Sequence, residues 1–234
     1  MKLPETWPEN GARIDSGRHA HDARHMNIRS ERLAHWFFRL NGFLTISNFV
    51  VHVDEGVGQH TDVDVLGVRF PHRAENQVRP MPDHPLFAGN ARMQVVLAET
   101  KRTLCRLNRA WTEPGRGNLE RVLSAAGFYA PAQMPAVAAA LYERGFWADL
   151  GSSARLVAVG EEHNRDLARR YPNVEQLFWR TDVLPFIHER FWAYRHEKRM
   201  HPQWDADAHA LFNTVMECGG DLAAFMAQVD IDGE

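Results

Sequence analysis

Apolar positions along the chain change period several times, and each change predicts an element. The segment 30–40 has apolar side chains at the i, i+3, i+4, i+7 spacing of an amphipathic helix: Leu33, Trp36, Phe37 and Leu40. Ser30 is a typical N-cap residue, and the pair Asn41-Gly42 suits a left-handed helix end. The pattern therefore predicts a helix that begins at Ser30 and ends before residue 42.

Three β-rich runs follow this helix. Residues 43–53 (FLTISNFVVHV) and 61–70 (TDVDVLGVRF) flank a turn with two glycines, which predicts an antiparallel hairpin. Residues 94–100 (QVVLAET) form the third run. The second and third runs are apolar at nearly every position, as is typical of strands buried on both faces.

The rest of the chain alternates between helical and extended patterns. Residues 118–126 and 131–144 are predicted to be helices, 155–160 and 175–179 to be strands, and the chain from 182 onward to be helical. The Pro- and His-rich stretch 71–92 is long for a loop in a compact domain, which favours a functional or variable insertion. These elements predict an α/β fold with a central mixed β-sheet flanked by helices.

The same pattern divides the chain into three parts. Residues 1–28 lack a sustained period and are predicted to be an irregular N-terminal arm. Residues 29–171 form the α/β core, and residues 172–234 form a mostly helical C-terminal extension packed on that core.

Composition narrows the class of protein. Among the 234 residues, no stretch approaches the ~18 apolar residues of a membrane-spanning helix, and the first residues lack the apolar core of a secretory signal. Two cysteines, Cys105 and Cys218, exclude a disulfide framework or a thiolate zinc cluster. We therefore expect a cytoplasmic protein without a membrane partner.

Charge bears on nucleic-acid binding in two ways. The net charge of −3, from 27 basic and 30 acidic residues, argues against a generally basic nucleic-acid binder. The stretch 101–121 nevertheless has a local basic excess. Four of its arginines are candidates for contacts with phosphates, although the same residues also suit a solvated loop: Arg102, Arg106, Arg109 and Arg116.

Charged residues inside the strands that are predicted to be buried indicate a functional site. Side chains alternate faces along a strand, so Glu99 and Lys101 share one face, and Asp62 and Asp64 share a face of their own strand. A charge in such a strand is costly unless it is paired or bound to a metal. If the two strands are neighbours, Asp64, Glu99 and Lys101 would compensate one another around a cation.

Such a group of residues suits phosphodiester hydrolysis. Mg²⁺ or Mn²⁺ takes oxygen ligands and needs only one or two carboxylates besides water and phosphate, which Asp64 and Glu99 would supply. The metal would lower the pKa of a bound water. Lys101 would orient or help to deprotonate that water and stabilise charge on the phosphate.

These residues give the chain a resemblance to a known family. Asp64 in TDVDVLGV and the triplet Glu99-Thr100-Lys101 ending QVVLAETK resemble the motif of the PD-(D/E)xK, or restriction endonuclease-like, nuclease superfamily. Glu31 in SERLAHWFFRLNGF resembles the helical glutamate that contacts the metal or its water shell in many members. The resemblance covers roughly residues 29–160. The chain departs from the pattern where no proline precedes Asp64, and residues 71–92 have to be an insertion.

The resemblance implies a restriction endonuclease-like core and a Mg²⁺-dependent nuclease that acts on DNA or, less often, on RNA. Asp64, Glu99 and Glu31 would bind the metal, and Lys101 would act on the water. Because many such nucleases pair to cut both strands, it also raises a homodimer or a larger assembly. Residues 172–234 match nothing in the superfamily.

Other interpretations of the same residues stay open. Glu99 and Lys101 suit a plain salt bridge at a sheet end, and Glu31 suits a favourable charge in the first turn of a helix. A catalytically silent nuclease fold could serve as a binding subunit of a defence or repair assembly. A third interpretation is a zinc hydrolase that uses three histidines of the N-terminal arm: His19, His21 and His25.

Overall fold

The computed structural model describes residues 25–88, 91–199 and 204–233. A six-stranded mixed sheet lies at its centre, with strand order β2-β3-β4-β6-β5 and with β7 also paired to β6. Strands β2 (Leu44–His52) and β3 (Gln59–Arg69) form the antiparallel hairpin that the sequence predicts. Strand β4 (Met93–Thr100) pairs antiparallel with β3, so the first three core strands form a meander.

The second half of the sheet is built by helical crossovers. Strand β6 (Ser152–Gly160) runs parallel to β4, and the chain between them forms α2 (Asn118–Ala126) and α3 (Met134–Arg144). After α4 (Arg165–Arg170), β7 (Glu175–Phe178) runs parallel to the end of β6. The short strand β5 (Phe146–Ala148), which the sequence analysis missed, pairs antiparallel with the start of β6.

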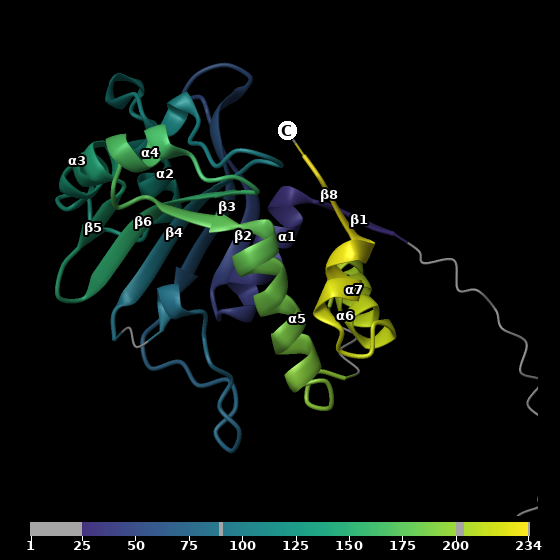
Figure 1. Ribbon diagram of the computed structural model, residues 1–234. Helices are drawn as coiled ribbons and strands as arrows, with labels where there is room; N and C mark the ends of the chain where they lie inside the picture. Colours follow the sequence, from purple (N-terminus) through teal and green to yellow (C-terminus); the bar gives the residue numbers. More distant parts are fainter. Residues whose placement is uncertain (1–24, 89–90, 200–203, 234) are drawn as a thin grey trace, which may run out of the picture.

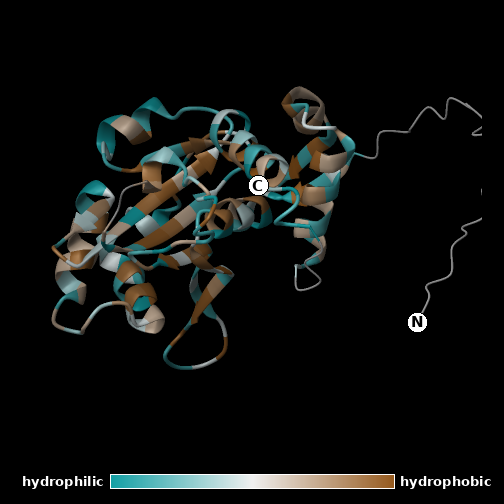
Figure 2. Ribbon diagram, turned by 90° about the horizontal axis from the view of Figure 1, so that it is seen from below, coloured by the Kyte–Doolittle hydropathy of each residue, from teal (hydrophilic) through white to brown (hydrophobic). Residues whose placement is uncertain are grey.

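Helices cover both faces of the sheet (Figure 1). On one face, α1 (Ser30–Leu40) and α5 (Leu184–Ala193) pack through a cluster of aromatic and branched side chains. On the other face, α2 and α3 pack on a second apolar cluster. The apolar strands stand out between the layers in Figure 2. An α/β fold with a mixed sheet flanked by helices, as predicted, is therefore what the structure shows.

The C-terminal part is joined to the core more closely than the sequence predicts. The boundary expected after residue 171 precedes β7, yet β7 is hydrogen-bonded to β6, so the central sheet continues beyond that boundary. Helix α5 also covers the sheet directly. The helices α6 (Ala206–Glu217) and α7 (Leu222–Gln228) lie outside α5 and α1 (Figure 1).

The two ends of the described chain meet in a small second sheet. Strand β1 (Met26–Arg29) pairs parallel with β8 (Val229–Asp232). The last residues of the expected irregular arm are thus a strand, because they find a partner about 200 residues away along the sequence. Residues 1–24 of that arm lie outside the described residues. No helix in the described segments has both the length and the apolar character needed to cross a membrane.

Residues 101–105 follow β4 and cover the end of β6; we call this segment the strap. It fixes the direction in which the chain leaves the sheet. Lys101 N donates to Val159 O at 2.8 Å, and Cys105 N donates to Glu162 O at 3.0 Å. Gly160 lies beneath this strap, where a Cβ atom would lie 2.7 Å from Thr103 O. Glycine is therefore required at residue 160 for a close backbone approach.

We predict that Gly160→Ala lowers the free energy of unfolding by about 1–3 kcal/mol, because the added methyl group has to displace backbone atoms rather than a flexible side chain. Gly151→Ala is the matched control, since the nearest atom to its Cβ would be 3.8 Å away. Urea unfolding followed by circular dichroism measures both variants. Equal stability of the two would contradict the close packing of the strap on Gly160.

Candidate functional site

Asp64 lies at the point where β3 passes the end of β4. Its Oδ2 atom accepts hydrogen bonds from Thr100 N at 2.7 Å and from Thr100 Oγ1 at 2.9 Å. The ladder that pairs Val65 with Ala98 sets Asp64 opposite the last residues of β4. In the described part of the chain, no donor contacts the other oxygen, Oδ1, and the side chain is half-buried.

Glu99 and Lys101 form a buried ion pair one and three positions beyond Ala98. Lys101 Nζ lies 2.8 Å from Glu99 Oε1, and the two side chains are only 8% and 2% exposed. The second oxygen, Glu99 Oε2, accepts a hydrogen bond from Trp111 Nε1 at 2.7 Å. Trp111 is buried in the 3₁₀-helix Arg109–Trp111 (η2), which follows the strap. Each carboxylate oxygen of Glu99 therefore has an N–H partner: the ammonium group of Lys101 for Oε1 and the indole of Trp111 for Oε2.

The surroundings of the Glu99 carboxylate shift its pKa. Burial raises the pKa of Glu99, and the nearby negative charge of Asp64 raises it further, while Lys101 and Trp111 oppose the shift. Lys101 is the cation in contact with Glu99, and Asp64 is a second carboxylate whose charge acts on Glu99.

Glu31 approaches the site through two hydroxyl groups. Ser30 Oγ lies 3.1 Å from Thr100 Oγ1 and donates to Glu31 Oε2 at 3.4 Å. Arg29 Nη1 also contacts Glu31 Oε1 at 2.9 Å. Because each hydroxyl group has one proton, Ser30 and Thr100 can share a hydrogen bond only when Ser30 releases Glu31 or Thr100 Oγ1 releases Asp64. The structure places Asp64, Glu99 and Lys101 at the adjoining ends of β3 and β4, whereas Glu31 does not join Asp64 and Glu99 in a group of three potential metal ligands among the described residues.

Three further residues of this site escaped the sequence analysis. Thr100 and Ser30 are ordinary hydroxyl residues, and their role depends on the approach of α1 to the end of β4. Trp111 lies ten residues past Lys101 in an irregular stretch, so no periodicity points to it. Its only sequence signal is that a buried indole N–H needs an acceptor.

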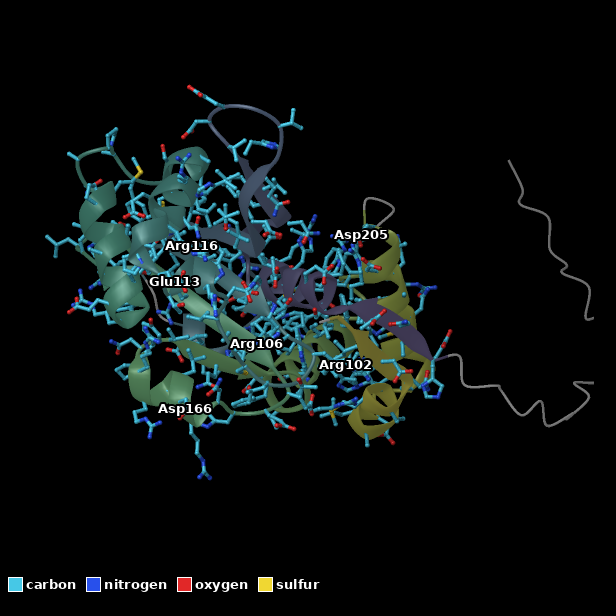
Figure 3. All side chains as sticks on the ribbon, turned by 90° about the horizontal axis from the view of Figure 1, so that it is seen from above. Arg102, Arg106, Glu113, Arg116, Asp166 and Asp205 are labelled. Carbon is cyan, nitrogen blue, oxygen red and sulfur yellow. The ribbon has the colours of Figure 1, made fainter. Side chains whose placement is uncertain are left out.

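The four candidate arginines separate into two groups. Arg109 and Arg116 both contact Glu113, at 3.7 and 2.6 Å, and their side chains are 82% and 54% exposed. Figure 3 shows Arg116 beside Glu113 and well away from Arg102. Arg102 and Arg106 are exposed and have no ion-pair partner among the described residues. For Arg102 and Arg106, therefore, no carboxylate of the described residues competes for the guanidinium group.

A polar cavity of about 490 Å³ lies next to the strap, where the parallel strands β4 and β6 end. Arg102 and Thr103 line one side, and Glu161, Glu162 and Arg180 line another. Residues of β8 complete the wall. Ligands of open α/β sheets commonly bind at the carboxyl ends of parallel strands. The cavity lies beside Arg102, but Asp64, Glu99 and Lys101 are not among the residues that line it.

The residues fit a hard divalent cation held by few protein ligands. The uncompensated negative charge between Asp64 and Glu99 would be relieved by a cation, and Asp64 Oδ1 remains available as a ligand. Mg²⁺ is commonly bound through one or two carboxylates, with water and phosphate as the other ligands. Within the described segments, no group of three or more His, Cys, Asp or Glu side chains is placed to hold a metal.

The remaining sequence candidates lie apart from this site. Asp62 is exposed and pairs with Val50 in the hairpin. His25 contacts Asp230 at 3.5 Å at the exposed second sheet. The other two histidines of the zinc interpretation, His19 and His21, lie outside the described residues. The chain was also compared with known proteins: no protein-family model, curated protein or solved structure matches it.

We predict that Glu99 makes the stability of the fold fall as pH rises. The pKa of Glu99 is raised in the folded state, so above its usual value of 4.5 the unfolded chain releases this proton first. The raised pKa of Glu99 therefore adds to the free energy of unfolding. This contribution is fully present below pH 4.5 and is lost as pH rises through the folded-state pKa.

Glu99→Gln should abolish this part of the pH dependence, whatever its effect on absolute stability. Urea unfolding between about pH 4 and pH 8 measures the slope. The control is Glu55→Gln, at an exposed position in the hairpin turn, which should leave the slope unchanged. A Glu99→Gln variant with the slope of the unmodified protein would show that burial and Asp64 do not act on Glu99 in this way.

Proposed function

We propose that this protein is a metal-dependent nuclease that hydrolyses phosphodiester bonds, with DNA as its substrate. The observation that carries the proposal is the meeting of Asp64, Glu99 and Lys101 at the adjoining ends of β3 and β4, with two carboxylates for one ammonium group. This is the set of charges that a hard cation and a phosphate would complete.

The order of the elements supports the same proposal. A helix, a three-stranded antiparallel meander, helices and a parallel strand follow one another from α1 to β6. The resemblance to restriction endonuclease-like proteins implies this order, with the aspartate on the second strand and the Glu-x-Lys triplet at the end of the third. The segment 71–92 enters between these strands as an insertion, without changing their pairing.

Each residue of the proposed site has its own role in the reaction. A bound Mg²⁺ or Mn²⁺ supplies Lewis acidity toward phosphoryl oxygens and lowers the pKa of its water. Asp64 and Glu99 hold the cation, and Glu31 helps to position its water shell. Lys101 has three N–H donors, of which one is directed at Glu99, so two remain to orient the attacking water and to bind a phosphate oxygen.

The supporting residues keep these groups in place. Thr100 fixes Asp64 with two hydrogen bonds, which leaves Oδ1 directed away from them. Trp111 holds Glu99 Oε2 and so prevents this side chain from turning away from Lys101. Arg102 and Arg106 extend from the strap and would contact the phosphates of the substrate.

A second candidate function is a catalytically silent nuclease fold that binds a partner. Its supporting observation is the near-complete burial of Glu99 and Lys101, which contact each other directly without a metal between them. Such a protein would act as a binding subunit of a defence or repair assembly. It predicts no cleavage and no Mn²⁺ binding at this site.

We predict cleavage of plasmid, linear or single-stranded DNA, or of RNA, in the presence of Mg²⁺ or Mn²⁺. Lys101→Met should reduce the rate by about 100-fold or more, because it removes the charge near the phosphate and keeps the aliphatic stem. Asp64→Asn should have a similar effect and should also abolish Mn²⁺ binding measured by calorimetry.

Arg169→Gln is the matched control for this assay. Arg169 is 81% exposed on α4, and its ion pair among the described residues is with Asp166, so its loss should leave cleavage unchanged. Cleavage by Lys101→Met at the unmodified rate would reject the proposed site. Mn²⁺ binding without cleavage on any substrate would reject the activity, and absence of both would favour the silent binding subunit.

A further inference from the structure

The outer edge of β2 is an uncovered apolar surface. Among the described residues, β2 is hydrogen-bonded to β3 on one side and to no strand on the other. Leu44, Ile46 and Val50 on this strand are 65%, 54% and 37% exposed. Phe70 is also exposed, and it lies two residues beyond Val68, the partner of Leu44 on β3. The other exposed large apolar side chains of the described chain lie in four separate segments: Val57, Val78, Leu104 and Leu150.

Four apolar side chains of β2 share one face of the sheet. The β3 partners of Leu44 and Ile46 belong to the apolar cluster beneath α2 and α3, and Phe49 and Val51 belong to or pack on the same cluster. Side chains of a regular strand alternate strictly between faces, so even and odd positions cannot normally share one. They do so here because Asn48, with a φ of 52°, interrupts the extended backbone between them.

This edge lacks most of the features that keep edge strands apart. Natural edge strands are commonly protected by charged side chains, by proline or by an irregularity of the backbone. No Asp, Glu, Lys, Arg or Pro occurs between residues 43 and 53. The kink at Asn48 is the one protective feature of this strand, and it leaves the most exposed part, residues 44–47, in ladder register with β3. Such an edge is a template for pairing with another strand.

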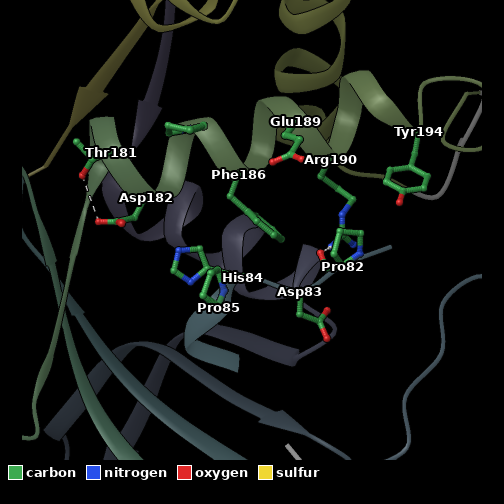
Figure 4. A pocket seen from close by; sticks show the side chains of 11 residues that line it. Pro82, Asp83, His84, Pro85, Thr181, Asp182, Phe186, Glu189, Arg190 and Tyr194 are labelled. Atoms are coloured by element: carbon green, nitrogen blue, oxygen red, sulfur yellow. Dashed lines mark hydrogen bonds between the residues drawn. The ribbon is translucent and has the colours of Figure 1, made fainter. Parts of the chain in front are cut away.

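The insertion 71–92 does not cover this edge, because it is held on α5. Tyr194 donates from its hydroxyl group to Pro80 O at 2.7 Å. The rings of His84 and Phe186 lie 5.9 Å apart beside a second cavity, of about 350 Å³, between the segment 82–85 and α5 (Figure 4). Within the described residues, the outer edge of β2 therefore stays open.

The charges at the two ends of β2 favour a second copy of this chain as the partner. Arg39 is exposed in the last turn of α1, before β2 begins, and Glu55 is exposed in the hairpin turn after β2 ends. Neither has an ion-pair partner among the described residues. Antiparallel pairing of two β2 strands brings the α1 end of one copy to the hairpin turn of the other, so opposite charges meet at both ends. Because residues 43–53 contain no acidic or basic side chain other than His52, little like-charge repulsion opposes this pairing.

We propose that two copies of this protein associate through antiparallel pairing of their β2 strands, which joins their central sheets into one. Leu44 and Ile46 of each copy then pack beside Phe49 and Val51 of the second copy, on the face that these four residues share. The contact uses the same surface of both copies and closes with two-fold symmetry. The proposal is independent of the nuclease activity.

The first test measures the mass of the unmodified protein in solution by sedimentation and light scattering over a wide range of concentrations. We expect twice the mass of one chain. Ile46→Lys should raise the dissociation constant of the dimer about 10-fold or more, because it places a charge in the apolar edge. Leu150→Lys is the matched control, since this side chain is 98% exposed in the turn between β5 and β6 and its replacement should leave the mass unchanged. Circular dichroism verifies that both variants are folded.

A charge exchange tests the direction of the pairing. Arg39→Glu or Glu55→Arg alone should weaken the dimer about 3-fold, because like charges then meet at both ends. The two substitutions together should restore the affinity, which a general effect on the fold of one copy would not do.

Hydrogen exchange locates the contact. The backbone amides of residues 44–47 should exchange more slowly at concentrations where the dimer forms, because the outer edge of β2 becomes hydrogen-bonded. A monomer at every concentration would overturn the proposal and leave the edge to a different partner. A dimer that Ile46→Lys does not weaken, or that forms without protection of residues 44–47, would also overturn it, because another surface would then be the interface.

Discussion

The structure depends on the burial of β4 in the middle of the sheet. This strand is hydrogen-bonded to β3 and β6 and is covered by helices on both faces. Charges at its end have little access to water and must find partners within the protein. The Glu99–Lys101 pair, the indole of Trp111 and the approach of Asp64 all follow from this constraint.

Ion pairs also organise the part of the insertion between residues 73 and 83. Glu75 and Asp83 enter a region that holds four cationic side chains, and every one of these cations contacts a carboxylate. A buried ion pair contributes little net stability compared with an apolar replacement, but it fixes one geometry. At the insertion the fixed geometry is that of Glu75 and Asp83 against their cations, and at β4 it is that of the candidate carboxylate site.

The short π-helix Trp179–Val183 connects the two regions. Trp179, its first residue, donates from Nε1 to Lys101 O at 3.0 Å, and Asp182, its fourth, lines the second cavity. This helix is therefore hydrogen-bonded to the backbone at the end of the candidate carboxylate site.

Local patterns in the sequence predicted most of the core elements and the candidate site residues. The helix 30–40 and the core strands follow from their periods, and Asp64, Glu99 and Lys101 are visible because charges conflict with otherwise apolar strands. Contacts between distant segments were decided only by tertiary structure: Trp111 on Glu99, the pairing of β1 with β8, and β7 in the central sheet. No local period encodes such contacts, because each depends on how separate elements pack.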